Sequence, residues 1–199
     1  METTELKIIE AAKKVFVRKG KDGTRMQEIA DEAGINKSLL HYYYRTKEKL
    51  FGAVFKFAFS KFAPELVNSF NSDVDIFTKI ENFINNYIDL INKNPFIPLF
   101  ILNEINKKDA SFVTNFIKSS GINVNQFRNQ INLEIEKGTI KKIDPNNLIV
   151  NIIGLCVFPF IGKPLIQVIL FDDNENEYDN FLLNRKKEVA EFIINSIKK

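Results

Sequence analysis

The side chains best suited to chemistry in this 199-residue chain lie in residues 36–50, NKSLLHYYYRTKEKL. This segment holds three consecutive tyrosines, the only histidine of the chain, three lysines and one arginine. Lysine and arginine neutralise phosphates, Ser and Tyr hydroxyls donate hydrogen bonds to phosphate oxygens, and a tyrosine ring can rest on a thymine methyl. Such a mixture is typical of a surface that contacts DNA.

The elements that would position this segment predict a helix-turn-helix. Residues 24–33 read as a short amphipathic helix, with a capping box that starts at Thr24 and has Gln27 three residues later. A glycine follows as the stop of this helix. Asn36 can cap a second short helix over roughly 37–44. Two short helices joined by such a turn have the proportions of a helix-turn-helix.

The second helix of this pair is predicted to expose a polar and cationic face, while Leu39 or Leu40 anchors it inward. Lys47 lies at the start of the next helix, where free backbone N–H groups and the helix dipole favour a phosphate. His41 has no second histidine and no nearby cysteine with which to bind a metal, so we interpret it as a surface or DNA-facing residue. The predicted DNA contacts are Thr24, Arg25, Lys37, Ser38, Leu39, His41, Tyr42, Tyr43 and Lys47.

The charge and cysteine content agree with a DNA-binding protein of a reducing compartment. Residues 1–50 hold 11 Lys and Arg against 8 Asp and Glu, a balance of +3, whereas the remaining residues hold 17 against 17. A solvated basic face is the alternative reading of this small excess. The single cysteine, Cys156, excludes an intrachain disulfide and favours the cytoplasm. Because its neighbours are apolar, we interpret it as a buried inert thiol, with a redox sensor as the alternative.

Helical periodicity continues along the rest of the chain, and no alternating strand pattern is present. The expected fold class is therefore all-α. Gly121 is expected to bend one long helix, and the pair Asp144–Pro145 is a typical helix start. The predicted helices cover residues 4–19, a long stretch from 47, 75–92, 96–107, 109–137, 145–161 and 178–198.

Residues 24–50, TRMQEIADEAGINKSLLHYYYRTKEKL, resemble the DNA-binding signature of the TetR-type transcriptional regulators. The likeness rests on the run Ile29, Ala30, Ala33 and Gly34, the turn residue Ile35, the aromatic run that ends at Tyr44, and Lys47 three residues on. Asn36 stands where the family usually has serine. His41, Tyr42 and Tyr44 are aromatic exchanges with respect to the family, which bear on base preference more than on DNA binding.

The resemblance implies a three-helix DNA-binding domain, placed at residues 1–46, and a helical domain at 47–199 that binds a small molecule. It also implies a homodimer through the last helices, at about 144–162 and 178–198, and repression that the ligand relieves. The chain has 19 phenylalanines, many in helices that would enclose a cavity, although core packing is the alternative for each. The candidate ligand contacts are Phe55, Phe59, Phe62, Tyr87, Asn103, Gln126 and Phe158.

Two other readings compete with this one. A helical enzyme or carrier would use the aromatic cavity for a hydrophobic molecule, but the sequence offers no Glu-x-x-His pair, no nucleophile with an adjacent base and no cofactor loop. We therefore expect no enzyme activity, no cofactor and no metal. Residues 148–171 carry one charge and are long enough for a membrane span, yet a helix buried inside a dimer looks the same. We expect no membrane. The acidic loop at 172–179 lacks calcium-loop spacing and is read as solvated.

Overall fold

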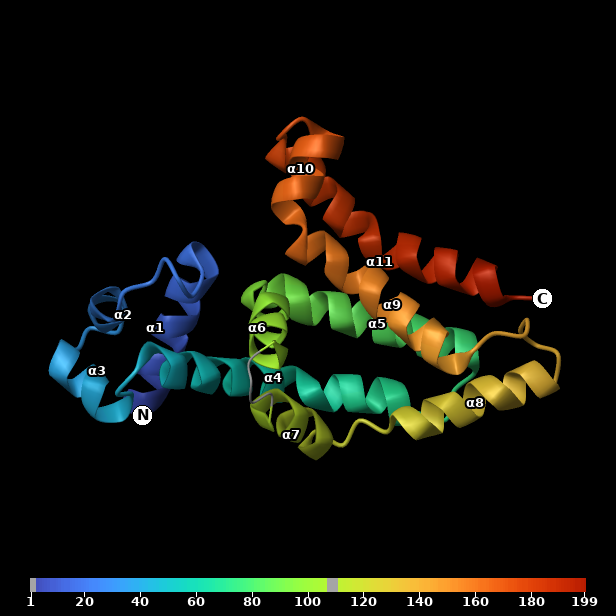
Figure 1. The fold of residues 1–199 in the computed structure, drawn as a ribbon, viewed down its shortest axis with the longest axis horizontal. Coiled ribbons are helices and arrows are strands. Elements are labelled where there is room, and N and C mark those ends of the chain that lie inside the picture. The colour runs from blue at the N-terminus through green and yellow to red at the C-terminus, as the bar shows by residue number, and fades with distance from the viewer. Residues whose placement is uncertain (1–2, 107–110) are drawn as a thin grey trace. The chain divides into compact units, whose positions relative to one another are not determined.

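The computed structural model describes residues 3–106 and 111–199, without the side chains of residues 61–63, 65, 66, 104, 111–113 and 117. Within these residues the chain is built of helices joined by turns and loops (Figure 1). Their one β-type contact is an isolated bridge between Ile140 and Lys198. The predicted all-α fold class is confirmed.

By packing, the chain divides into two compact units. The first comprises Met1–Phe62 and Asn94–Ile97, and the second comprises Ala63–Lys93 and Pro98–Lys199. Helix α4 (Lys47–Asn71) contributes residues to both units. The functional division expected between residues 46 and 47 stays a prediction.

The N-terminal unit is built on α1 (Thr4–Lys19), α2 (Met26–Glu32), α3 (Lys37–Tyr43) and the first part of α4. These helices form because apolar residues recur at three- and four-residue spacing and are buried together. The rings of Phe16 and Phe51 meet edge to face, with centroids 4.5 Å apart. Fully or almost fully buried core residues are Ile8, Ala12, Val15, Phe16, Ile29, Ala30, Leu40, Leu50 and Phe51.

The C-terminal unit has a central group of three helices that pack on one another: α5 (Ile76–Lys93), α9 (Pro145–Ile161) and α11 (Glu175–Ile197). Helices α8 (Val124–Glu136) and α10 (Lys163–Phe171) pack against this group, and the unit also contains α7 (Ser111–Ser119) and most of α6 (Phe96–Ile105). Helix α9 begins as predicted, because the Asp144 side chain accepts a hydrogen bond from the Asn146 N–H and Pro145 occupies the first turn.

Two helix predictions in this unit are corrected. The long helix expected over 109–137 is two helices, α7 and α8, because Gly121 has a φ of +82° and ends the helical path instead of bending it. The final helix begins at Glu175, not near residue 178, because the side chain of Asn174 caps its first N–H groups. Helix α10 was not predicted as a separate element.

Candidate nucleic-acid interface

The turn between α2 and α3 has the geometry of a helix-turn-helix. Gly34 has a φ of +65°, and its N–H donates to the carbonyl of Asp31 at 3.1 Å, which closes the end of α2. At the start of α3 the Asn36 side chain accepts a hydrogen bond from the Leu39 N–H at 2.7 Å, as predicted. The two helices are thus fixed to each other by a left-handed glycine and a cap.

The capping box at the start of α2 differs from the prediction. The carboxylate that reaches back is that of Glu28, which accepts from the Arg25 N–H at 3.0 Å. Thr24 is instead buried, and its hydroxyl donates to the carbonyl of Gly20 at 2.6 Å. Its side chain therefore serves the fold, and a surface contact of this hydroxyl with DNA is not supported. Arg25 is exposed at the start of α2, where a DNA contact is feasible.

Helix α3 exposes the residues that were predicted to read DNA. Leu40 is the buried anchor, whereas Leu39 is 36% exposed, which settles the alternative left open by the sequence. Tyr42 is 81% exposed and meets the ring of Tyr43 edge to face, with centroids 5.6 Å apart. The remaining exposed members of this face are Lys37, Ser38 and His41. We call the face formed by Lys37, Ser38, Leu39, His41, Tyr42 and Tyr43 the α3 face.

Tyr44 ends α3 and has a different environment from its two tyrosine neighbours. It is buried, and its hydroxyl donates to the Glu5 carboxylate of α1 at 2.9 Å. Burial first, and the adjacent Glu5 charge second, raise the pKa of Tyr44 above its usual range. This tyrosine holds α3 against α1 and keeps the α3 face turned outward.

Lys47 lies at the start of α4, where the Thr46 hydroxyl accepts from the Lys49 N–H at 3.2 Å. The Lys47 ammonium donates to the carbonyls of Thr24 at 3.0 Å and Asp22 at 3.4 Å. This half-buried side chain therefore ties α4 to the loop before α2. An ammonium has three donors, so one remains for a phosphate.

Helices α1 and α2 are joined on their outer surface by ion pairs. Arg18 meets Glu32 at 2.8 Å, and Lys19 meets Glu28 at 2.6 Å. The hydrogen bonds from these cations lower the pKa of both carboxyls, although the groups are exposed and screened by water. Several of the N-terminal cations are thus engaged within the unit and are not free for a polyanion.

Sequence reasoning missed one candidate. Arg45 is exposed directly after α3, and its position in the quoted segment next to the tyrosines was a sufficient signal. An exposed guanidinium in this position can form a bidentate interaction with a backbone phosphate.

The candidate effector residues fall in both units. Phe55 and Phe59 are buried in the N-terminal unit, with ring centroids 5.9 Å apart. Phe62 ends the first segment of that unit, and its side chain lies outside the described residues. The shared cavity expected for these rings stays a prediction.

The other candidates belong to the C-terminal unit. Tyr87 is half-buried and stacks on Phe83, with centroids 5.4 Å apart. Asn103 and Gln126 are exposed, and Phe158 is 57% exposed. Their role as ligand contacts also stays a prediction.

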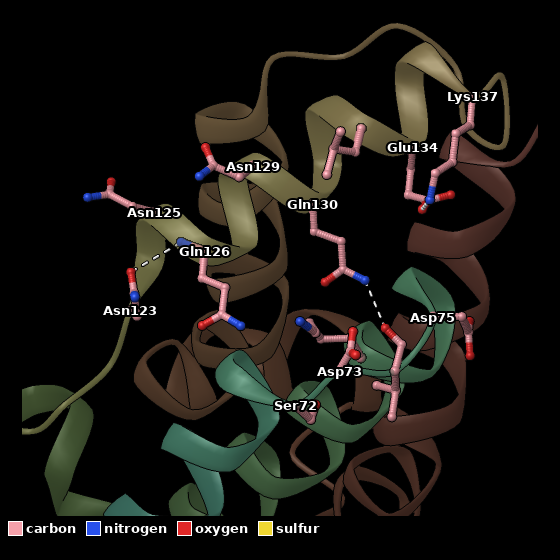
Figure 2. A pocket seen from close by; sticks show the side chains of 13 residues that line it. Ser72, Asp73, Asp75, Asn123, Asn125, Gln126, Asn129, Gln130, Glu134 and Lys137 are labelled. Atoms are coloured by element: carbon pink, nitrogen blue, oxygen red, sulfur yellow. Dashed lines mark hydrogen bonds and ion pairs between the residues drawn. The ribbon is translucent and has the colours of Figure 1, made fainter.

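Gln126 lines an open polar cleft of about 770 Å³ between the turn that joins α4 to α5 and helix α8 (Figure 2). Its amide donates to the Asn71 carbonyl at 3.3 Å, and that of Gln130 donates to the Val74 carbonyl at 2.8 Å. The carboxylate of Asp75 caps α5, and that of Glu134 pairs with Lys137 at 2.8 Å. In the described part of the chain no group of His, Cys, Asp and Glu side chains is arranged to hold a metal ion.

Helices α9 and α11 carry the apolar surface expected to form a dimer. A groove of about 680 Å³ lies between them, and the exposed fractions of Val150 and Phe192 at its edge are 65% and 64%. Cys156 faces inward, and burial raises the pKa of its thiol to about 12, which agrees with the buried inert reading. No single described helix is long and apolar enough to cross a membrane, whereas α9 and α10 pass that test only together and are bent by 79° at their junction.

Comparisons with known proteins match this geometry. Residues 8–54 fit the family described as bacterial regulatory proteins, tetR family. The HTH-type transcriptional repressor SCO4008 of Streptomyces coelicolor is 45% identical over 53 residues, which make up 27% of this chain and 28% of that protein. The matched segment thus spans little more than a quarter of that curated relative.

Solved structures show the same fold over a larger share of the chain. HlyIIR, a hemolysin II transcriptional regulator, is 24% identical, with a TM-score of 0.62 over 98% of this chain and 97% of its own. AibR, solved with isovaleryl coenzyme A and operator DNA, is 17% identical, with a TM-score of 0.65 over 80% of this chain and 86% of its own.

The turn between α2 and α3, with the outward α3 face, gives the N-terminal unit the architecture of a helix-turn-helix. Residues 8–54 match the family of bacterial regulatory proteins, tetR family, in the segment where the sequence resemblance predicted it.

Proposed function

We propose that this protein is a cytoplasmic, ligand-responsive transcriptional regulator, with repression as the expected output. The observation that carries the proposal is the α3 face. All of its side chains are exposed, whereas Leu40 and Tyr44 are buried and anchor the helix. Exposed tyrosines and a lysine on a helix of this size fit the major groove, and the N-terminus of α2 and Arg45 supply phosphate contacts.

A homodimer is part of the proposal, because a single unit of this size reads only a half-site. The groove between α9 and α11, with Val150 and Phe192 exposed at its edge, is the surface that we expect a second copy to cover. Two α3 faces would then enter successive major grooves about 34–36 Å apart, or a multiple of that distance. The operator is therefore expected to be palindromic.

An effector is the third part of the proposal. Helix α4 runs from the DNA-binding region to residues of the C-terminal unit, so a ligand that displaces α4 near Phe55 or Phe59 would change the spacing of the two α3 faces. Coupling between two such sites is typically about 1–3 kcal/mol, or about 5- to 150-fold in affinity. The relative AibR, solved with isovaleryl coenzyme A and operator DNA, supports the combination of a small-molecule site and a DNA site on this fold.

Selection from a pool of random DNA duplexes tests the proposal. The wild-type chain is expected to enrich a palindrome whose half-sites are separated by one helical turn or a multiple of it. Enrichment of no sequence, by a protein that is folded and dimeric, would contradict the proposal. A Tyr42→Ala chain is the matched control, since it lacks an exposed side chain of the α3 face and is expected to enrich the palindrome poorly.

A further inference from the structure

Helix α9 contains a proline, Pro159, near its C-terminal end. Because proline has no N–H, the carbonyl of Leu155, four residues earlier, loses its usual partner within the helix. Arg185 of α11 replaces that partner, since its Nη2 donates to the Leu155 carbonyl at 3.0 Å. Tyr178, also on α11, donates its hydroxyl to the carbonyl of Pro159. Two side chains of α11 therefore satisfy the carbonyls around the proline.

This structural role does not account for the choice of arginine. One neutral donor would satisfy the Leu155 carbonyl, whereas arginine adds a permanent charge in a half-buried position. Its Nε is buried and finds no hydrogen-bond acceptor. Its guanidinium lies 5.5 Å from the ring centroid of Phe181, which offers attraction to a cation but no hydrogen bond.

The lysine next to Arg185 on α11 forms an ordinary ion pair with a carboxylate. Lys186, the next residue of α11, forms an ion pair with Asp89 of α5. Arg185 has no carboxylate within ion-pair distance among the residues that the structure describes. Burial lowers the pKa of Arg185, and this effect exceeds the opposing influence of Cys156 and Glu188. A half-buried charge in this state is costly unless something else pairs with it.

A second hydrogen-bond donor without an acceptor among the described residues is the hydroxyl of Tyr87 on α5. Helices α5, α9 and α11 pack on one another, and Tyr87 of α5 lies two residues before Asp89, whose carboxylate pairs with Lys186, the residue after Arg185 of α11. The Tyr87 hydroxyl makes no hydrogen bond in the described part of the chain, and burial raises its pKa. Tyr87 is nevertheless only half-buried, and one of its ring faces stacks on Phe83.

We propose that Arg185 recognises the anionic end of the effector, a carboxylate or a phosphate, with Tyr87 as a second hydrogen-bond donor. Guanidinium forks match both anions, and a phenol donates to either one. The Phe83–Tyr87 stack supplies apolar surface for the rest of the molecule, so the expected ligand is amphipathic and negatively charged at one end. This inference rests on the effector part of the proposed function.

Calorimetric titration of the full-length protein with matched probes tests the charge requirement. Hexanoate, decanoate and hexadecanoate are compared with their methyl esters, and decyl phosphate separates a phosphate preference from a carboxylate preference. The wild-type protein is expected to bind at least one anion roughly tenfold or more tightly than the neutral ester of the same chain length. Equal affinity for anion and ester would overturn the proposal.

Single substitutions test whether Arg185 is the residue responsible for the preference for the anion over the ester. Arg185→Gln keeps a donor for the Leu155 carbonyl but removes the charge, so it should abolish the preference for the anion, whereas Arg185→Lys should retain part of it. Lys186→Gln is the control, because it removes an equal charge from the adjacent position and should leave the preference intact. A preference that survives Arg185→Gln, or that falls equally with Lys186→Gln, overturns the role of Arg185. If no probe binds, the proposal also fails, and a DNA titration of the same preparation shows separately whether the proposed DNA-binding function stands.

Discussion

At the scale of single residues, two nearby tyrosines of the same aromatic run have opposite tasks. Tyr42 is 81% exposed, whereas Tyr44 is 8% exposed and donates to Glu5 at 2.9 Å. One side chain is therefore available to a partner, and the other fixes the helix that presents it. The sequence alone places both in one run of identical residues, and only helical geometry separates them.

Substitution of each tyrosine should separate binding from stability. Tyr42→Ala is expected to leave the melting temperature unchanged, since an exposed side chain away from packing contributes little, and to weaken DNA binding clearly. Tyr44→Phe is the counterpart and should lower stability by about 1 kcal/mol through the lost hydrogen bond. Thermal melts and fluorescence titrations on the selected duplex check both. A Tyr42→Ala protein that binds as tightly as wild type would remove this residue from the interface.

Lys47 is a residue with two roles to distinguish. As a phosphate contact, its replacement in Lys47→Ala should weaken binding about equally on all DNA sequences and reduce the salt slope by about one. As a tie between α4 and the carbonyls of Asp22 and Thr24, its loss should lower stability instead. Titrations over a range of salt concentrations, with Lys49→Ala as the control, separate the two. An unchanged affinity and salt slope would mean that Lys47 has no contact with phosphate.

At the scale of elements, the sequence predicts the features that local rules determine. Gly34, Asn36 and the Asp144–Pro145 pair are stop and start signals that act within one turn, so the helices they bound lie where expected. The start of α11 was misplaced although its cap, Asn174, is also a local signal. The failure at Gly121 has a conformational cause. A glycine in the sequence is compatible with either a bend or an end of a helix. The φ of +82° at Gly121 shows that the helix ends there.

Site prediction from sequence has the same limit. The exposed positions of α3 follow from helical periodicity once Leu40 is taken as the anchor. Thr24 was assigned to the DNA surface because of its position, yet its hydroxyl bonds to Gly20, which is a contact between loop residues that periodicity does not reveal. Arg185 was not singled out, since its significance depends on Pro159 of another helix.

The apolar face of α9 and α11 is predicted to form the dimer interface. Phe192 is 64% exposed at the edge of the groove between the two helices, and we expect a second copy to cover it. Phe192→Asp places a charge in that interface and should yield monomers or aggregates in sedimentation. Leu133→Asp is the matched control, because Leu133 of α8 is 52% exposed and lies outside the groove. A wild-type chain that remains a monomer at micromolar concentration would contradict the dimer.

At the scale of the whole molecule, the two units must communicate if a ligand is to control DNA binding. Coupling requires that the ligand bind differently to the DNA-bound and the free state. Compounds that raise the melting temperature of the free protein are therefore expected to weaken its binding to the selected duplex, by about 5- to 150-fold. Paired melting and titration experiments over a set of apolar and amphipathic compounds check this. If compounds stabilise the protein yet leave DNA affinity unchanged, the chain binds DNA constitutively.

The central claim is that a dimer reads a specific DNA sequence through the α3 face. The most direct measurement is an equilibrium titration of the full-length protein on the selected palindrome and on a scrambled duplex, at several salt concentrations. We predict two chains per duplex, a linear fall of log affinity with log salt on both sequences, and binding to the palindrome that is about 10³-fold or more tighter than to the scrambled duplex. Equal affinity for the two duplexes, or no binding at low salt, would contradict the account.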